Sequence, residues 1–269
     1  MKRLFVLGAA LAACLALGTA SAVAAPGSVV CSDDSFSGTA KNVIVPSEHG
    51  CDLLGATVTH DVIVEDHSGV FSDGSRIGHD MVLQQEAEFE AMGGTTIGHD
   101  LMSGSGSSVH LEQTAIGGDL RAFQPSNVQT GGIGPDTPGG PVRVEHDFVI
   151  QGSPADNDFV FDGLGQLTVG RDLTITNRSV TLGFTIGGDR IGRDLVVTYD
   201  SALEGFFGPS YLVVRDNSVG RDLIFEHNTA ASGGGLVVTQ NAVARDALCA
   251  NNDPPPSGGN VVGRTNTCG

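Results

Sequence analysis

Basic and acidic side chains occupy adjacent places in a short phrase that recurs along the chain, as in Val219-Gly220-Arg221-Asp222-Leu223. Counting the opening residue as position 0, position 2 is basic in ten of eleven copies and position 3 is aspartate in nine. The principal basic residues are His60, His79, His99, His146, Arg171, Arg193, Arg221 and Arg245. The aspartates are Asp61, Asp80, Asp100, Asp119, Asp147, Asp172, Asp194, Asp222 and Asp246. Such groups could pair with one another, bind calcium or bind a transition metal.

A structural role is favoured for both columns. If each copy forms one coil of a solenoid, equivalent residues lie roughly 4.8 Å apart along the axis. Carboxylates so placed can accept backbone N–H groups at each corner and pair with the basic column beside them. Stacked imidazoles point the same way and do not converge as tetrahedral metal ligands must, so we predict no metal site and no cofactor. Calcium bridging by the aspartates is the alternative.

Glu86, Glu88 and Glu90 alternate with Ala87 and Phe89, which predicts an acidic stripe on the outer face of a strand. Paired carboxylates can hydrolyse glycosides, but this requires a facing partner. The chain has no Gly-x-Ser-x-Gly elbow and no phosphate loop. It also has no Trp and only two Tyr for stacking against sugars. We therefore predict no catalytic residues.

The elements that must position these columns are strands. Positions 4 and 6 of the phrase are mostly apolar, so they point into one core, whereas position 5 can face outward. Second apolar strands precede many copies, for example at residues 109–111 and 211–214. Position 1 is Gly in seven of eleven copies, which indicates a corner whose backbone conformation is costly for other residues.

The predicted fold class is all-β, a single-stranded parallel β-helix of about eleven coils forming one domain over residues 25–269. No long segment beyond the N-terminus keeps helical periodicity. The copies begin at intervals of 19 to 28 residues, at Thr39, Val58, Ile77, Ile97, Ile116, Val144, Val169, Ile191, Val219, Val243 and Val262. The sequence does not indicate an oligomeric state.

Four cysteines lie near the two ends of this repeat. Cys31 and Cys51 are 20 residues apart, and Cys249 and Cys268 are 19 apart, so each pair is separated by one coil. Neighbouring coils are close enough for disulfide geometry, and an exported protein can keep such bonds. We predict one disulfide at each end.

Residues 1–24 have the pattern of a secretory signal peptide. Lys2 and Arg3 precede an apolar run over residues 4–17, and Ala22-Val23-Ala24 forms a small-residue cleavage signal. Lipidation of Cys14 is the alternative. No later segment approaches membrane-spanning length, and a net charge of −17 disfavours nucleic acid as a partner. The predicted location is secreted or at the cell surface.

The Ile-Gly-x-Asp-Leu pattern, as at Ile97-Gly98-His99-Asp100-Leu101, resembles right-handed, pectate-lyase-like β-helices over residues 39–269. It is similar to secreted bacterial repeat proteins with no assigned activity, and to bactofilins. The resemblance implies a right-handed coil. The expected function is an exported, non-catalytic structural, adhesive or cell-wall-associated solenoid that contacts cell-wall polysaccharide or extracellular protein. A calcium- or glycan-binding module and a polysaccharide lyase or hydrolase are the alternatives.

Overall fold

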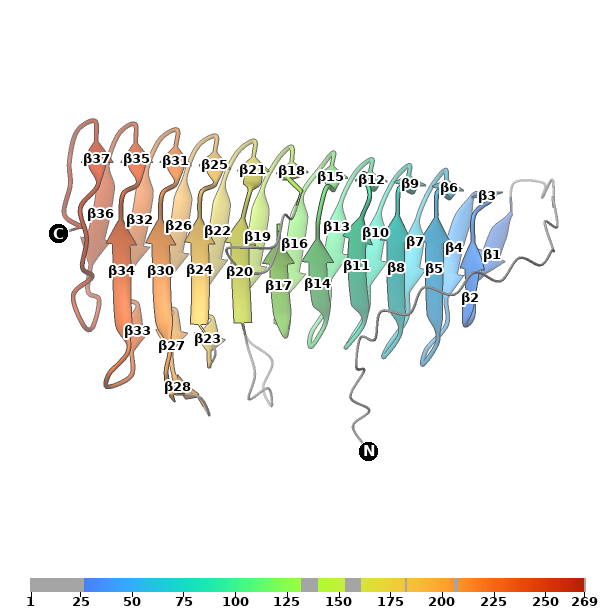
Figure 1. The fold of residues 1–269 in the computed structure, drawn as a ribbon, viewed down its shortest axis with the longest axis horizontal. Coiled ribbons are helices and arrows are strands. Elements are labelled where there is room, and N and C mark those ends of the chain that lie inside the picture. The colour runs from blue at the N-terminus through green and yellow to red at the C-terminus, as the bar shows by residue number, and fades with distance from the viewer. Residues whose placement is uncertain (1–26, 132–139, 153–160, 182, 206–207, 269) are drawn as a thin grey trace, which may run out of the picture.

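A computed structural model describes residues 27–131, 140–152, 161–181, 183–205 and 208–268. Within these residues the chain forms strands and no helix, and it winds as one parallel β-solenoid (Figure 1). The predicted signal peptide and Cys14 lie outside the described residues. The predicted all-β solenoid is confirmed.

Three long sheets, here named A, B and C, run the length of the solenoid. Sheet A contains β1 (Ser28–Val30), β4 (Asn42–Val45), β7 (Val62–Val64), β10 (Met81–Leu83), β13 (Leu101–Ser103), β16 (Leu120–Phe123), β19 (Phe148–Gln151), β22 (Leu173–Thr176), β26 (Leu195–Thr198), β32 (Leu223–Glu226) and β36 (Ala247–Ala250). Sheet B contains β2 (Asp34–Phe36), β5 (Gly50–Leu54), β8 (Gly69–Asp73), β11 (Glu88–Met92), β14 (Ser108–Leu111), β17 (Asn127–Thr130), β20 (Phe161–Gly165), β24 (Gly183–Gly187), β30 (Tyr211–Arg215) and β34 (Gly235–Thr239).

Sheet C is built mainly from two-residue strands. It contains β3 (Thr39–Ala40), β6 (Thr57–Val58), β9 (Arg76–Ile77), β12 (Thr96–Ile97), β15 (Ala115–Ile116), β18 (Val142–Val144), β21 (Leu167–Val169), β25 (Arg190–Ile191), β31 (Ser218–Val219), β35 (Ala242–Val243) and β37 (Val261–Val262). Two small sheets add β23 (Ser179–Val180), β27 (Ser201–Ala202) and β33 (Thr229–Ala230), and the antiparallel pair β28 (Glu204–Gly205) and β29 (Gly208–Pro209).

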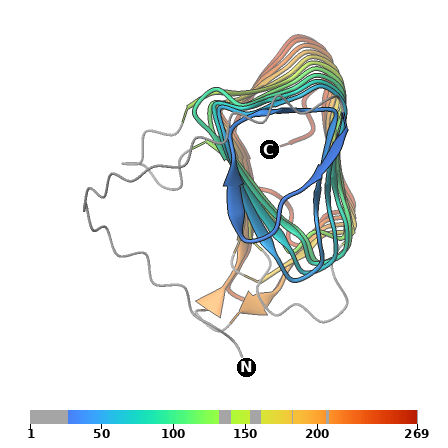
Figure 2. The same cartoon turned by 90° about the vertical axis from the view of Figure 1, so that its right-hand side faces the viewer.

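Each coil passes through sheets A, B and C in turn, which gives the solenoid a three-sided outline (Figure 2). In Figure 1 the chain rises through the near sheet B, crosses the top and descends behind in sheet A, which is a right-handed course. The number of complete turns is slightly below the expected eleven because the last coil has strands in sheets A and C only. In the second to tenth copies the recurring phrase therefore spans a corner: position 0 ends a sheet C strand, and position 4 begins the next sheet A strand. The predicted start of the first copy at Thr39 was wrong by one residue, because Ala40 is the residue that pairs in register with Val58.

The core is filled by the inward columns of the three sheets. In sheet A, Val43, Val62 and Met81 are stacked in register, and each is 0% exposed. Burying one such side chain contributes about 1.5–3 kcal/mol. Because every coil adds equivalent residues at the same place, the core extends along the axis and needs no second layer.

Gly recurs at position 1 of the phrase for a steric reason, and not for the backbone conformation that the sequence suggested. The φ angle of Gly78 is not in the left-handed region; instead, a Cβ there would overlap the carbonyl oxygen of Thr59 in the preceding coil. Positive φ is concentrated at other corners, as in Glu48, His67 and Glu86 with φ of 66°, 59° and 55°. Close approach of neighbouring coils therefore selects Gly at this corner.

We predict that Gly220→Ala destabilises the solenoid by about 1–3 kcal/mol, because the added methyl overlaps backbone atoms of Gly192 that cannot move independently. Equilibrium chemical denaturation measures the effect. Gly259→Ala is the matched control, because a Cβ at Gly259 meets no atom within 4 Å. Equal midpoints for the two variants would show that the close approach does not select Gly.

Candidate functional site

The aspartate column forms a continuous hydrogen-bonded ladder at the corner between sheets C and A. The Oδ1 atom of Asp80 accepts the backbone N–H of Asp100 at 3.0 Å, and Asp100 accepts that of Asp119 at 2.8 Å. The same bond recurs from Asn42 to Thr265, with N–O distances of 2.8–3.2 Å. These carboxylates satisfy backbone donors at a corner, where the chain leaves the regular sheet bonding.

The basic column pairs with aspartates of the preceding coil. The Nδ1 atom of His99 lies 2.9 Å from Asp80, and Arg171 donates to Asp147 at 3.1 Å. Arg221 and Arg245 each pair through two guanidinium nitrogens, with Asp194 and Asp222 respectively. Each carboxylate thus contacts a cation or an imidazole as well as a backbone N–H.

Gly118 supplies no basic side chain to Asp100 of the preceding coil, so Asp100 is paired with the His99 ring of its own coil at 3.5 Å. Asp119, the residue after Gly118, is paired with two arginines. Arg121, at position 5 of the same coil, donates to Asp119 at 2.7 Å, and Arg171 reaches the same carboxylate at 3.3 Å. Burial acts to raise the pKa of Asp119, but the backbone N–H of Asp147 and the guanidinium of Arg121 lower it overall. The carboxylate therefore stays ionised through these contacts, and the His146 ring lies 3.9 Å from it.

Pairing between His99 and Asp80 shifts the pKa values of the two side chains in opposite directions. The hydrogen bond that the His99 ring donates to Asp80, followed by the charge of Asp100, raises the pKa of His99 above its ordinary value. Burial acts to raise the pKa of Asp80, but the N–H of Asp100 and the ring of His99 lower it overall. Each charge is therefore stabilised by the other.

His79, Asp80 and His99 place three possible metal-ligand atoms within 4.8 Å of one another. The two rings are stacked, with centroids 4.9 Å apart and planes at 8°. Each Nδ1 points at a carboxylate, since His79 lies 3.0 Å from Asp61 and His99 lies 2.9 Å from Asp80. A metal would have to replace these contacts, so the geometry favours an ion-pair ladder.

A further ladder, which the sequence analysis missed, lies inside the solenoid two residues before the phrase. Asn217 accepts the N–H of Asp189 at 3.0 Å, and its own amide donates to the carbonyl of Ile186 at 3.1 Å. Asn241 and Asn260 repeat this arrangement. The signal was a polar column at position −2, visible in the same alignment of copies.

Asp189 occupies an asparagine place in this ladder. Its Oδ1 accepts the N–H of Leu167 at 3.0 Å, whereas its buried Oδ2 has no hydrogen-bond partner among the described residues. Burial raises the pKa of Asp189 to about 7. By register, the carbonyl that an amide would reach here belongs to Leu164, which pairs with Ile186. A protonated carboxyl can donate to that carbonyl in place of an amide.

A second internal ladder follows sheet A. Asn228 accepts the N–H of Asp200 at 2.9 Å, and Asn252 accepts that of Asn228 at 2.9 Å. Asp200 in turn accepts the N–H of Arg178, a residue that is 1% exposed. The Arg178 guanidinium donates to the carbonyls of residues 125 and 152 at 2.7 Å. These groups connect coils and offer no solvent-facing chemistry.

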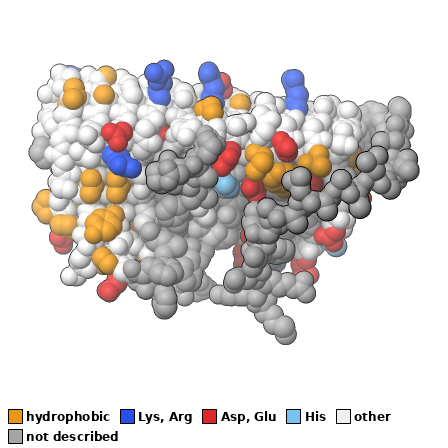
Figure 3. Space-filling view, in the orientation of Figure 1, with side chains coloured by type: hydrophobic (Ala, Val, Ile, Leu, Met, Phe, Trp, Pro, Cys, Tyr) orange, Lys and Arg blue, Asp and Glu red, His pale blue; other side chains and the backbone are white. Residues whose placement is uncertain are grey.

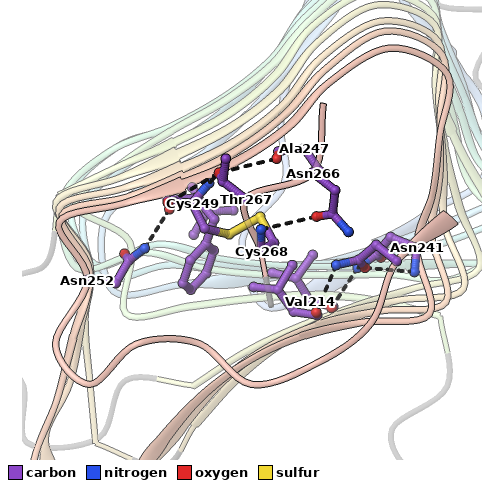
Figure 4. The surroundings of a disulfide bond; sticks show 12 residues. Val214, Asn241, Ala247, Cys249, Asn252, Asn266, Thr267 and Cys268 are labelled. Atoms are coloured by element: carbon purple, nitrogen blue, oxygen red, sulfur yellow. Dashed lines mark hydrogen bonds between the residues drawn. A yellow bond between two sulfur atoms is a disulfide. The ribbon is translucent and has the colours of Figure 1, made fainter. Parts of the chain in front are cut away.

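Disulfides close both ends of the solenoid. Cys31 is joined to Cys51 and Cys249 to Cys268, with Cα separations of 5.7 and 4.9 Å. In Figure 4 the second bond lies beside Thr267, whose hydroxyl accepts the N–H of Cys249 at 2.8 Å. A disulfide closing a loop of this length contributes about 3 kcal/mol in the chain-entropy model.

The predicted acidic stripe is only partly on a strand. Glu88 and Glu90 face outward from β11 and are exposed. Glu86 instead lies at the preceding corner with positive φ, where its carboxylate is 3.0 Å from the His67 ring. Its placement on the strand was wrong because the chain turns between Gln85 and Glu88.

A groove of about 1000 Å³ follows the outer face of sheet B near the N-terminal end. Its charged and aromatic lining includes Asp33, Asp34, Asp52, Phe71, Glu88, Glu90 and His110. Figure 3 looks onto this side of the molecule, where acidic and apolar side chains lie together on the right and further apolar side chains lie on the left. We call this hollow the sheet B groove.

The register of the sheet B groove limits what its carboxylates can do. Glu90 is paired in register with Phe71 and His110, and Glu88 with Gly69 and Ser108. The His110 ring is 3.9 Å from Glu90 through Nδ1 and 3.4 Å from Glu112 through Nε2. Neither glutamate has a second carboxylate as its register partner on an adjacent strand. The arrangement suits binding of cations or hydroxyl groups better than paired acid–base catalysis.

Comparison with known proteins finds no matching family model, no matching curated protein and no matching solved structure. Among the residues that the structure describes, none forms a helix long and apolar enough to cross a membrane.

We predict that the coil around His99 is best protected between about pH 4 and 6.5. A raised histidine pKa gives stabilisation that is complete below the unfolded pKa and fades as pH rises through the folded pKa. The lowered pKa of Asp80 has the opposite pH dependence: the stability that the Asp80 carboxylate contributes is lost as pH falls through its folded pKa. Hydrogen exchange at pH 5.5 and 8, corrected for intrinsic rates, should be faster at pH 8 for the amides of residues 97–103 and should change little for residues 219–225.

The variant His99→Gln is the control for this pH effect, because it removes the titrating ring that pairs with Asp80. The difference between the two pH values should then shrink at residues 97–103. An unchanged difference in the variant would assign the effect to other groups.

We predict that Asp189→Asn stabilises the protein above pH 7. A folded pKa near 7 against about 3.9 unfolded makes the wild-type carboxyl lose stability as pH rises from 4 to 7. The difference between variant and wild type should therefore grow to the order of 2–4 kcal/mol at pH 8. Chemical denaturation at pH 4.5 and 8 measures it, and an equal difference at both pH values would show that Asp189 is ionised throughout.

Proposed function

We propose that the protein is an exported, non-catalytic solenoid with a structural or adhesive role, in contact with cell-wall polysaccharide or extracellular protein. The observation that carries this proposal is the continuous ladder from Asn42 to Thr265. In it the regularly repeated charged residues bind backbone groups and one another across coils. Their regular chemistry thereby supports a long, rigid scaffold.

Export is supported by two independent features. The first is the N-terminal pattern over residues 1–24, with its basic start, apolar run and cleavage signal. The second is the pair of disulfides at the ends, a kind of bond that persists in oxidising compartments. Each disulfide also ties down a terminal coil, where an open sheet edge would otherwise invite association.

A non-catalytic role is supported by the surroundings of the acidic residues. The glutamates of β11 have no carboxylate as register partner, and the aspartates of the ladder are engaged with backbone N–H groups. Sugar-cleaving sites also rely on aromatic stacking, and this chain contains no Trp. Catalysis by the β-helix class remains an analogy of fold alone.

Glycan binding in the sheet B groove is the second candidate. The groove combines exposed carboxylates, the His110 ring and the Phe71 side chain over several adjacent strands. A polysaccharide chain could lie along it, with hydroxyl groups donating to carboxylates, or with calcium joining acidic sugars to Asp52 and Glu90. This candidate places the contact on the outer face of sheet B.

We predict that the purified mature protein retains a cell-wall polysaccharide or an extracellular protein in a pull-down and releases no sugar products in a parallel depolymerisation assay. Glu88→Gln should weaken retention of a glycan bound in the groove, whereas Glu48→Gln, at a corner outside the groove lining, should not. Calcium-dependent retention would favour the cation-bridged form. Sugar release abolished by Glu88→Gln would instead establish an enzyme.

A further inference from the structure

Position 5 of the phrase faces outward from sheet A and forms a second kind of column. Over the first ten copies, from Ile44 to Leu248, this position is aliphatic in eight and is interrupted only by Arg121 and Thr174. The residues are paired in register from strand to strand; Met102 is exposed, and the other seven apolar residues are half-buried. We call this column the sheet A stripe.

Strand propensity alone does not explain the sheet A stripe. The equivalent outward column of sheet B, in the same N-terminal coils, carries Asp52, Phe71, Glu90, His110 and Gln129. Both faces belong to parallel strands with the same backbone conformation, so intrinsic strand propensity favours the same residue types on both. In the N-terminal coils the aliphatic residues are therefore specific to the outer face of sheet A, whereas in the C-terminal coils sheet B also has Val213 and Val237 at outward positions. A continuous apolar face that reaches solvent is typical of interaction sites.

We infer that a second copy of this chain covers the sheet A stripe, face to face and antiparallel, which goes beyond the proposed function. Ten coils spaced by roughly 4.8 Å make the stripe about 45 Å long. The strands of sheet A are three or four residues long, roughly 10–13 Å, so the flat face measures about 450–600 Å² per partner before the corner side chains are added, against ~800 Å² in typical stable complexes. A flat face of this kind is self-complementary about a two-fold axis.

The antiparallel orientation follows from the charges beside the stripe. Along the adjoining corner the N-terminal half has aspartates with histidines, whereas the C-terminal half has Arg171, Arg193, Arg221 and Arg245. A two-fold axis parallel to the strands places the half with aspartate and histidine of each copy against the half of the other copy in which arginine balances the aspartates, and it keeps the two histidine-containing halves apart. It also places Val82 opposite Val196, and Ile63 opposite Ile224, of the other copy.

Sedimentation velocity of the mature protein in 0.15 M salt tests the dimer, because surface repulsion between acidic copies is largely screened there. We expect a dimer at concentrations up to about 100 μM, a range in which an interface of this size is well populated. A monomer throughout this range overturns the inference, whether or not the protein binds a glycan.

Two charge variants test the surface, with a control in the same coil. Val82→Lys and Val196→Glu each bury an unpaired charge and should weaken dimerisation roughly a hundredfold. Val213→Glu changes an outward residue on sheet B of the coil that contains Val196, and it should dimerise like the wild type. Circular dichroism and thermal midpoints verify folding. A dimer that survives both stripe variants overturns the assignment of this face.

Mixing the two charge variants tests the orientation. In an antiparallel dimer the introduced ammonium at position 82 faces the introduced carboxylate at position 196, and the second such site stays wild type. The mixture should therefore recover dimers that neither variant forms alone. A parallel dimer places each position against itself, so failure to recover dimers overturns the antiparallel arrangement.

Discussion

The hydrogen bond from a corner backbone N–H to the aspartate of the neighbouring coil is the interaction on which this solenoid depends. At the corner between sheets C and A the chain leaves regular strand geometry, and the Oδ1 of each aspartate accepts the N–H of the next, as Asp80 does for Asp100. Stacked carboxylates at that spacing repel by about 0.9 kcal/mol per pair even in water. The basic column beside them offsets this repulsion, which explains why the two columns occur together.

Backbone N–H groups at the internal corners also need acceptors, and a different residue type supplies them there. On the surface, aspartate can remain charged because water and cations reach it, whereas the internal corners use Asn217, Asn241 and Asn228. A neutral amide both accepts an N–H and donates to a carbonyl, so it satisfies two backbone groups without burying a charge. Asp189 departs from this rule, and its pKa of about 7 follows from the missing donor and its burial.

The side chains of the three corners and of the core hold the coils together. The outer faces of the sheets are therefore the surfaces available for binding partners. The N-terminal part of sheet B presents carboxylates and His110 in a groove, whereas sheet A presents an aliphatic column along its length. These faces suit different partners: polar, hydroxyl-rich or cationic ligands for the first, and a complementary apolar surface for the second. A rigid solenoid can display both at once because each face belongs to a different side of the same coils.

The parallel solenoid, the apolar columns and the one-coil separation of each cysteine pair could be predicted from the sequence. This was possible because stacking coils repeats each environment, so one-dimensional spacing carries three-dimensional information. The folded structure was needed to show that each coil has three sides, that Gly78 avoids a clash with Thr59, and that Glu86 lies at a corner. It was also needed to show which polar columns are internal and how the sheet B groove is lined. These features depend on where the backbone bends and how closely coils approach, and neither quantity is expressed in the spacing of residue types.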